Sequence, residues 1–191
     1  MKIGLYFGSF NPIHNGHLVI AGYMAEFTDI DQVWMVVSPQ NPLKAKTGLL
    51  KDTHRLALVN EAIGHYRKIK ASNIEFKMPQ PSYTINTLLH LAEKYPQHRF
   101  VLIMGQDNLQ TFDRWKNYQD ILKNYELYIY PRPNIEGDKF MNHPKVKLVD
   151  APMMEISASF IRKAIKDKKD VRFMVPESVY NYMTEMHFYE K

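Results

Sequence analysis

The sequence predicts an α/β fold in which helices cover both faces of a doubly wound, mostly parallel sheet. Three observations support this class. Short apolar runs rich in β-branched and aromatic residues recur along the chain. Segments with the apolar spacing of a helix lie between these runs, and the most unusual polar residues follow directly after them. Near-continuous apolar strands that alternate with helices are typical of a parallel sheet buried on both faces.

The apolar runs predict four strands, because each run is short, continuous and bounded by polar or turn residues. In chain order they are KIGLYFG at 2–8, QVWMVVS at 32–38, RFVLIMG at 99–105 and ELYIYP at 126–131. Ligands of such sheets bind at the carboxyl ends of the strands, where the connection order changes direction. The segments GSFNPIHNGH, SPQNPLK and GQDN follow the first three of these strands, so we expect them to meet at one edge of the sheet.

Helices are expected where apolar residues recur three and four positions apart. This spacing predicts helices over 17–27, 53–66 and 84–95, and a shorter helix in NLQTF at 108–112. In EISASFIRKAI, at 155–165, Ser157 is a good N-cap. The apolar positions of the helix that follows are Phe160, Ile161, Ala164 and Ile165. We interpret residues 1–191 as one domain, with residues 157–191 as its C-terminal helical part.

Composition and charge exclude several classes of protein. Of the 191 residues, 45% are hydrophobic and 24% charged, which is typical of a globular domain. The absence of cysteine excludes disulfides, thiolate zinc sites and a cysteine nucleophile. No run is apolar for long enough to cross a membrane, and MKIGLYFGSF is too short an apolar run for a signal peptide, so a cytoplasmic protein is expected. The net charge of +5 suits nucleic acid or a small polyanionic substrate.

The first loop has the residues of an anion site. Gly8 allows the backbone to leave the strand, and Ser9 and Phe10 offer N–H groups. The helix that begins near Gly16 adds free N–H groups and a partial positive charge, and a missing Cβ at Gly16 lets a ligand approach the backbone. The pattern is neither a Walker loop nor GxGxxG.

Two histidines in this loop, His14 and His17, are three residues apart and are expected on one side of the helix start. Three readings are open: a phosphate site, a strand–helix turn with two incidental histidines, and a His-x-x-His metal site. The metal reading needs further ligands, and no third histidine or carboxylate is near in sequence. Similarly, Ser157 and Arg162 read alone are either an ordinary capped helix or a second phosphate site.

Two signatures carry a resemblance to a known family. GSFNPIHNGH matches the (T/S)xxxHxGH signature of the nucleotidylyltransferase superfamily, and ISASFIR resembles its ISxxxIR signature. Within it, PSYTINTL at 81–88 and IMGQDNLQTFDRW at 103–115 are similar to segments of the bacterial nicotinate mononucleotide adenylyltransferases. The matches run from residue 4 to about 186. The resemblance implies a single Rossmann-like domain that binds ATP and nicotinate mononucleotide and releases deamido-NAD and pyrophosphate.

The resemblance also implies roles for residues on the ATP side. His14, His17 and Arg162 would be catalytic and contact the phosphates, with His17 at the α-phosphate. Ser157 and Arg162 would hold the β and γ groups. The remaining ATP-binding positions would be Gly8, Ser9, Phe10, Gly16, Gly105, Asp107 and Ile156. Mg²⁺ would bridge phosphate oxygens and need few protein ligands, which suits a sequence without a carboxylate cluster.

Acceptor binding would depend on Lys44, Tyr83, Thr84 and Trp115. The face of Trp115 can stack on a cationic pyridine ring, although a lone tryptophan beside an apolar helix is often a core residue. Thr84 could cap its helix, and in the family this turn presents donors to the nicotinate carboxylate. Asp107 would bind a ribose hydroxyl or cap the helix in NLQTF. No nucleic-acid or membrane partner is implied, and a homo-oligomer is plausible for the family.

The sequence departs from the family pattern in three places. Many relatives have Pro-Pro-His-Lys/Arg after the second strand, where this chain has SPQNPLKAK and Lys44 is the nearest equivalent. Ser9 and Asn11 stand where threonine and aspartate are frequent. After YIYPRP, the usual glycine-rich continuation is replaced by NIEGDKF.

Three alternatives remain at this point. Another transferase of the same fold, such as the phosphopantetheine enzyme, shares both signatures but gives no reason for PSYT and Trp115. Nicotinamide mononucleotide differs from the nicotinate form by an amide in place of a carboxylate, and the sequence does not decide between them. A basic nucleic-acid-binding module is compatible with the charge, but no RNP-like string or zinc finger is present.

Overall fold

A six-stranded parallel sheet lies at the centre of the computed structural model, which describes residues 1–39, 48–135, 137 and 139–191. The strand order is β3-β2-β1-β4-β5-β6, and each neighbouring pair is parallel. The strands are β1 (Lys2–Gly8), β2 (Gln32–Val37), β3 (Ile69–Ser72), β4 (Arg99–Gly105), β5 (Glu126–Tyr130) and β6 (Val146–Leu148). The predicted fold class is confirmed, and the four predicted strands are present.

Two strands and several helix bounds differ from the predictions. β3 and β6 were not predicted, because Lys70, Ser72 and Lys147 interrupt their short apolar runs. The helices are α1 (Asn15–Phe27), α2 (Asp52–Ile63), α3 (Thr84–Lys94), α4 (Gln106–Leu109), α5 (Tyr118–Asn124), α6 (Ala158–Lys166) and α7 (Glu177–Glu185), with 3₁₀ turns at Ile74–Lys77 and Phe112–Arg114. α1 thus begins before Gly16, and α2 ends at Ile63 because Gly64 has a positive φ of 56°. The expected helix in NLQTF is instead α4 followed by a 3₁₀ turn.

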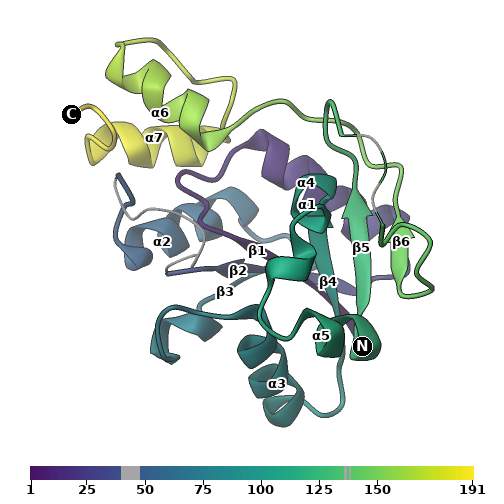
Figure 1. The fold of residues 1–191 in the computed structure, drawn as a ribbon. Coiled ribbons are helices and arrows are strands. Elements are labelled where there is room, and N and C mark those ends of the chain that lie inside the picture. The colour runs from purple at the N-terminus through teal and green to yellow at the C-terminus, as the bar shows by residue number, and fades with distance from the viewer. Residues whose placement is uncertain (40–47, 136, 138) are drawn as a thin grey trace.

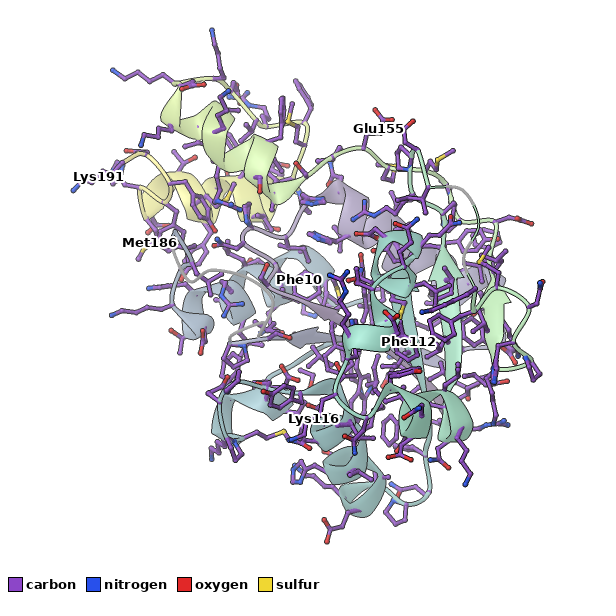
Figure 2. The ribbon with its side chains drawn as sticks, viewed as in Figure 1. Phe10, Phe112, Lys116, Glu155, Met186 and Lys191 are labelled. Carbon is purple, nitrogen blue, oxygen red and sulfur yellow. The ribbon has the colours of Figure 1, made fainter. Side chains whose placement is uncertain are left out.

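Alternate side chains of the strands enter two hydrophobic layers. In β1, Ile3 and Leu5 are buried in the layer that contains α3 and α5, while Tyr6 is buried in the layer that contains α1 and α2. Phe10 and Phe112, labelled in Figure 2, belong to these two different layers. Each fully buried aliphatic or aromatic side chain contributes about 1.5–3 kcal/mol, so both layers hold the sheet in place.

The connection order changes direction beside β1. The chain passes from β1 to β2 on one side and later returns to β4 on the other side. The loops that leave β1 and β4 therefore diverge to opposite faces and leave a crevice between them. This is the edge at which the unusual polar segments were expected.

The C-terminal helices belong to the layer of α1 and α2. Ile161 of α6 and Val179 and Met183 of α7 are buried there. Figure 1 shows α6 and α7 together, next to the loop that leaves β1. One expectation is wrong: Phe160, read as an apolar packing position, is 55% exposed. Among the described residues, no helix is long and apolar enough to cross a membrane.

Candidate active site

Phe10 shapes the loop after β1. Its side chain is 1% exposed, and its backbone has a positive φ of 44°. A Cβ at Gly8 would lie within 2.8–2.9 Å of the Phe10 ring. Gly8 is thus needed to admit this ring, rather than only to turn the chain as the sequence suggested. The buried ring in turn anchors the loop that carries Ser9.

His14 and His17 lie against each other at the start of α1. Their rings are stacked with centroids 3.7 Å apart, which confirms that they share one side. The backbone N–H of His14 donates to Nδ1 of His17 at 3.3 Å, so the proton of a neutral His17 ring belongs on Nε2. A Cβ at Gly16 would be 3.0 Å from Nδ1 of His14. The missing Cβ of Gly16 therefore makes room for the His14 ring, a reason that the sequence did not suggest.

The environment of His14 is positive and dry. The side chain is nearly fully buried, and burial, followed by the charge of Arg132, lowers its pKa from 6.5 to about 4. Its Nδ1 has no hydrogen-bond partner among the described residues. His14 is therefore neutral at pH 7.

The start of α6 meets this loop. Nη1 of Arg162 donates to the backbone carbonyl of Asn11 at 2.7 Å, and Nη2 donates to Oγ of Ser159 at 3.3 Å. Ser157 is the N-cap that was predicted, and its Oγ accepts from the N–H of Phe160 at 3.2 Å. Arg162 thus ties α6 to the loop that precedes α1.

The segment before α6 also lies against α1. Cβ of Met154 is 3.5 Å from the position a Cβ at Gly16 would take. Ile156 is partly buried and packs against the layer of α1 and α2. The backbone N–H of Asn15 donates to the carbonyl of Met174 at 2.9 Å. The segment before α6 and the loop between α6 and α7 therefore both contact the N-terminal turn of α1.

Arg55 is a structural cation that sequence reasoning missed. Its side chain is fully buried, and Nη1 donates to the carbonyls of Ser9 at 2.6 Å and Ser38 at 2.9 Å. Asp52 balances the charge through a 2.6 Å ion pair. A lone arginine within the apolar positions of RLALVNEAI was the available signal. Arg55 ties the carboxyl ends of β1 and β2 together.

A cavity of about 170 Å³ lies between the sheet edge and α3. Three of the predicted acceptor residues line it, namely Tyr83, Thr84 and Trp115, together with Gly105. Tyr6 lines the same cavity and its ring lies 6.2 Å from that of His17. The histidine pair and the cavity are therefore neighbours across a single aromatic ring.

The residues of the cavity wall are positioned by packing. Trp115 is half-buried, its ring lies 5.4 Å from Phe112, and its Nε1 has no partner within the part of the chain that is described. Thr84 is the first residue of α3, and the N-cap is Tyr83, so the expected capping by Thr84 is wrong. Backbone φ and ψ place Tyr83 in the extended N-cap conformation.

Asp107 and Arg132 form an ion pair at the end of β4 and β5, with 3.4 Å between Oδ1 and Nε. A Cβ at Gly105 would be 2.4 Å from Oδ1 of Asp107, so a larger residue there would displace the Asp107 side chain. The N-cap of α4 is Gly105, which excludes the alternative that Asp107 caps it. Arg132 was missed, although its place after the strand in YIYPRP was a usable signal.

Glu75 is a second missed residue of the cavity wall. It is 2% exposed, and its Oε1 accepts from Oγ1 of Thr87 at 2.7 Å. Burial raises the pKa of Glu75, while the hydroxyls of Thr87, Ser38 and Ser82 oppose that shift. Its Oε2 has no partner with hydrogen-bond geometry in the described ranges. A glutamate in an otherwise unremarked 3₁₀ turn gave no sequence signal.

Two further predictions concern Lys44 and a His-x-x-His metal site. Lys44 lies outside the described residues. In the described part of the chain, no three His, Asp or Glu side chains gather as a metal site. The His-x-x-His pair is thus not joined there by a third ligand of this kind.

Comparisons with known proteins agree with this geometry. A family model described as cytidylyltransferase-like matches residues 5–164. A Plasmodium falciparum nicotinic acid mononucleotide adenylyltransferase, solved in complex with NaAD, superposes with a TM-score of 0.84 at 21% identity. The superposition covers 99% of this chain and 97% of that one. At this identity the likeness establishes the fold.

Curated relatives are much more similar in sequence. A protein of Flavobacterium psychrophilum named "Probable nicotinate-nucleotide adenylyltransferase" is 55% identical over the full length of both chains. One of the same name from Bacteroides thetaiotaomicron is 45% identical and covers 97% of this chain and 92% of its own. Identity at this level, over this much of the chain, confirms the resemblance drawn from the two signatures. The chain belongs to the nicotinate-nucleotide adenylyltransferase family, within the cytidylyltransferase-like fold.

Proposed function

We propose that the chain moves AMP from ATP to nicotinate mononucleotide and releases deamido-NAD and pyrophosphate. The observation that carries this function is the meeting of three features at one sheet edge. The histidine pair at the start of α1 and Arg162 of α6 form a cationic, donor-rich site. The cavity that Trp115 lines lies directly beside it, across Tyr6.

The first site suits a triphosphate. Helix N-termini offer backbone N–H groups and a partial positive charge to anions, and we assign the N-termini of α1 and α6 to this site. We assign the α-phosphate to His17, whose Nε2 would donate, and the β and γ groups to Ser157 and Arg162. We assign His14 to the same phosphates, because its ring is stacked on that of His17. Ser9, Phe10, Gly16 and Ile156 would border the same anion through their backbone.

The reaction would be a direct in-line displacement. A phosphate oxygen of the mononucleotide forms a bond to the α-phosphorus of ATP as the bond from that phosphorus to the pyrophosphate oxygen breaks. The chain's part is to hold both phosphates in line and to stabilise the negative charge that builds on them. No covalent intermediate is needed, and the site residues described above serve as donors rather than nucleophiles.

We propose that Mg²⁺ arrives with ATP. Magnesium keeps several waters and is usually held by phosphates with few protein ligands, so a site built from histidine, arginine and backbone donors fits it. Asp107, the carboxylate at the end of β4, is already paired with Arg132. When bound, the ion neutralises charge on the phosphates.

The cavity favours an acidic acceptor. Arg114 and Lys116 line it, and Nζ of Lys116, labelled in Figure 2, lies 4.6 Å from the centre of the Tyr83 ring. The N-terminus of α3 adds partial positive charge. Glu75, a buried carboxylate in the wall, has a raised pKa, which reduces its repulsion of an anion. A nicotinate carboxylate is therefore better matched than an amide.

The test is release of pyrophosphate from ATP and Mg²⁺ with each acceptor in turn. Nicotinate mononucleotide should support turnover with kcat/KM at least tenfold above that for nicotinamide mononucleotide. Phosphopantetheine, the acceptor of the main enzyme alternative, should support none. Absence of release with both mononucleotides would reject the function, and a preference for the amide would reject the reading of the cavity.

The cytoplasmic location and a homo-oligomer remain predictions. Light scattering after size-exclusion chromatography would determine the oligomeric state.

A further inference from the structure

Asn11 is a buried junction between distant parts of the chain. It is 3% exposed and follows Phe10 in the loop after β1. Its Nδ2 donates to the carbonyl of Gly48 at 2.9 Å, and its Oδ1 accepts from the N–H of Leu50 at 3.2 Å. Its own carbonyl accepts from Arg162 at 2.7 Å. The side chain thus holds the segment before α2, while the backbone holds α6.

A fourth hydrogen bond reaches Asn11 from the C-terminal end. The hydroxyl of Tyr189 donates to Oδ1 of Asn11 at 2.7 Å, across 178 positions of sequence. Because the amide of Asn11 must donate through Nδ2 to Gly48, its orientation is fixed and Oδ1 faces Tyr189. Burial raises the pKa of Tyr189, so its hydroxyl keeps the proton that it donates.

The backbone around Tyr189 is arranged to make this contact. Tyr189 has a positive φ of 67° and His187 one of 52°, conformations that residues other than glycine rarely adopt. The neighbouring Phe188 packs 5.0 Å from the ring of His54 in α2. Tyr189 itself packs against the layer of α1 and α2. The last turn of the chain is therefore held in place from two sides.

We propose that Tyr189 is a positioning residue for the triphosphate of ATP, acting through Asn11 on the loop after β1 and on Arg162. This inference rests on the proposed function. The hydroxyl of Tyr189 restrains Asn11 through one hydrogen bond. The carbonyl of Asn11 in turn orients the guanidinium of Arg162. Arg162 in turn is assigned to the β and γ phosphates. Loss of the hydroxyl should then weaken ATP binding without affecting the acceptor cavity, because in the described part of the chain Asn11 hydrogen-bonds to none of the residues that line it.

The test compares Tyr189→Phe with Tyr182→Phe. Tyr182 is a matched control, because its hydroxyl lies in the same C-terminal part, half-buried, 3.4 Å from Nδ1 of His54, and away from Asn11. Three quantities are measured for both variants and the wild type. They are KM for ATP and for nicotinate mononucleotide, the Kd of a non-hydrolysable ATP analogue with Mg²⁺ by calorimetry, and Tm.

We expect Tyr189→Phe to raise KM for ATP and the analogue Kd about fivefold, which is about 1 kcal/mol at 1.4 kcal/mol per tenfold. KM for the mononucleotide should stay within twofold, and Tm should match that of Tyr182→Phe. Equal ATP affinity in the two variants would overturn the proposal. So would equal losses for ATP and acceptor, which indicate a general loss of structure.

A second variant tests the route. Asn11→Ala removes the acceptor for Tyr189 together with the donor to the carbonyl of Gly48, so ATP affinity should fall at least as far as in Tyr189→Phe. In the double variant the two losses should not add, because both break one junction. Full additivity would refute the route through Asn11. If the wild type binds the analogue but releases no pyrophosphate, the proposed function fails while the calorimetric comparison still decides this proposal.

Discussion

The depressed pKa of His14 predicts a specific dependence of stability on pH. Burial first, and the charge of Arg132 second, lower the pKa of this ring from 6.5 to about 4 in the folded chain. The unfolded chain therefore takes up the proton first as pH falls. Stability from this residue is fully present above about pH 6.5 and is lost as pH falls from there to about 4. The whole shift is worth about 3 kcal/mol, at about 1.4 kcal/mol per pH unit.

The variant His14→Asn isolates this effect. Asparagine is a favoured N-cap and does not titrate, so α1 keeps its start while the pH-dependent contribution disappears. Urea unfolding of both proteins at pH 7.5, 6.5, 5.5 and 4.5 gives the free energy of unfolding at each pH. The wild type should lose about 2.5 kcal/mol more than the variant between pH 7.5 and 4.5. Carboxylates titrate equally in the two proteins and cancel in the difference.

Parallel curves for the two proteins would refute the reasoning. They would mean that His14 titrates alike in the folded and unfolded chain, and so that the ring is solvated rather than buried against Arg132. A larger loss in the variant would refute the sign as well.

Three further variants probe the site. His17→Ala should lower kcat at least 100-fold and leave Tm within a few degrees of the wild type, because it removes the donor assigned to the α-phosphate. Steady-state kinetics and a thermal melt measure the two quantities. Near-normal turnover would show that the assignment of His17 is wrong. Trp115→Ala should raise the Kd of nicotinate mononucleotide about tenfold and leave ATP affinity unchanged, because the acceptor loses a stacking partner. Calorimetry measures both affinities. An unchanged acceptor affinity would mean that the Trp115 ring only packs in the core. Arg132→Gln should raise the pKa of His14 toward 6.5 in an NMR titration, because a facing positive charge is removed, and an unmoved titration would leave burial as the sole cause.

Sequence patterns predicted those parts of the fold that are encoded locally. β1, β2, β4 and β5 are continuous apolar runs, and the cap at Ser157 is a single-residue signal. β3 and β6 were missed because they are only four and three residues long and contain polar residues. They are the two edge strands, and pairing with β2 and β5 makes them strands.

The site was predictable to the extent that its residues follow strands. His14, His17 and Trp115 stand in recognisable segments, but the reasons for Gly8 and Gly16 did not show in the sequence. Both glycines make room for the rings of Phe10 and His14, and such a requirement arises only when side chains meet. Arg55 and Glu75 are buried charges, and it is their partners in the fold that explain their burial. The sequence signals of Arg55 and Arg132, a lone arginine in an apolar helix and an arginine after a strand, were overlooked.

The free protein holds features that are unfavourable by themselves. A histidine is kept neutral beside an arginine, and its buried Nδ1 lacks a partner in the described part of the chain. Burying a polar atom without a hydrogen bond costs about 1–3 kcal/mol. An incoming polyanion would relieve both, because it accepts hydrogen bonds and raises the pKa of the ring that it meets. The cost of burying this ring and its affinity for phosphate then have one origin, the burial of an imidazole in the positive field of Arg132.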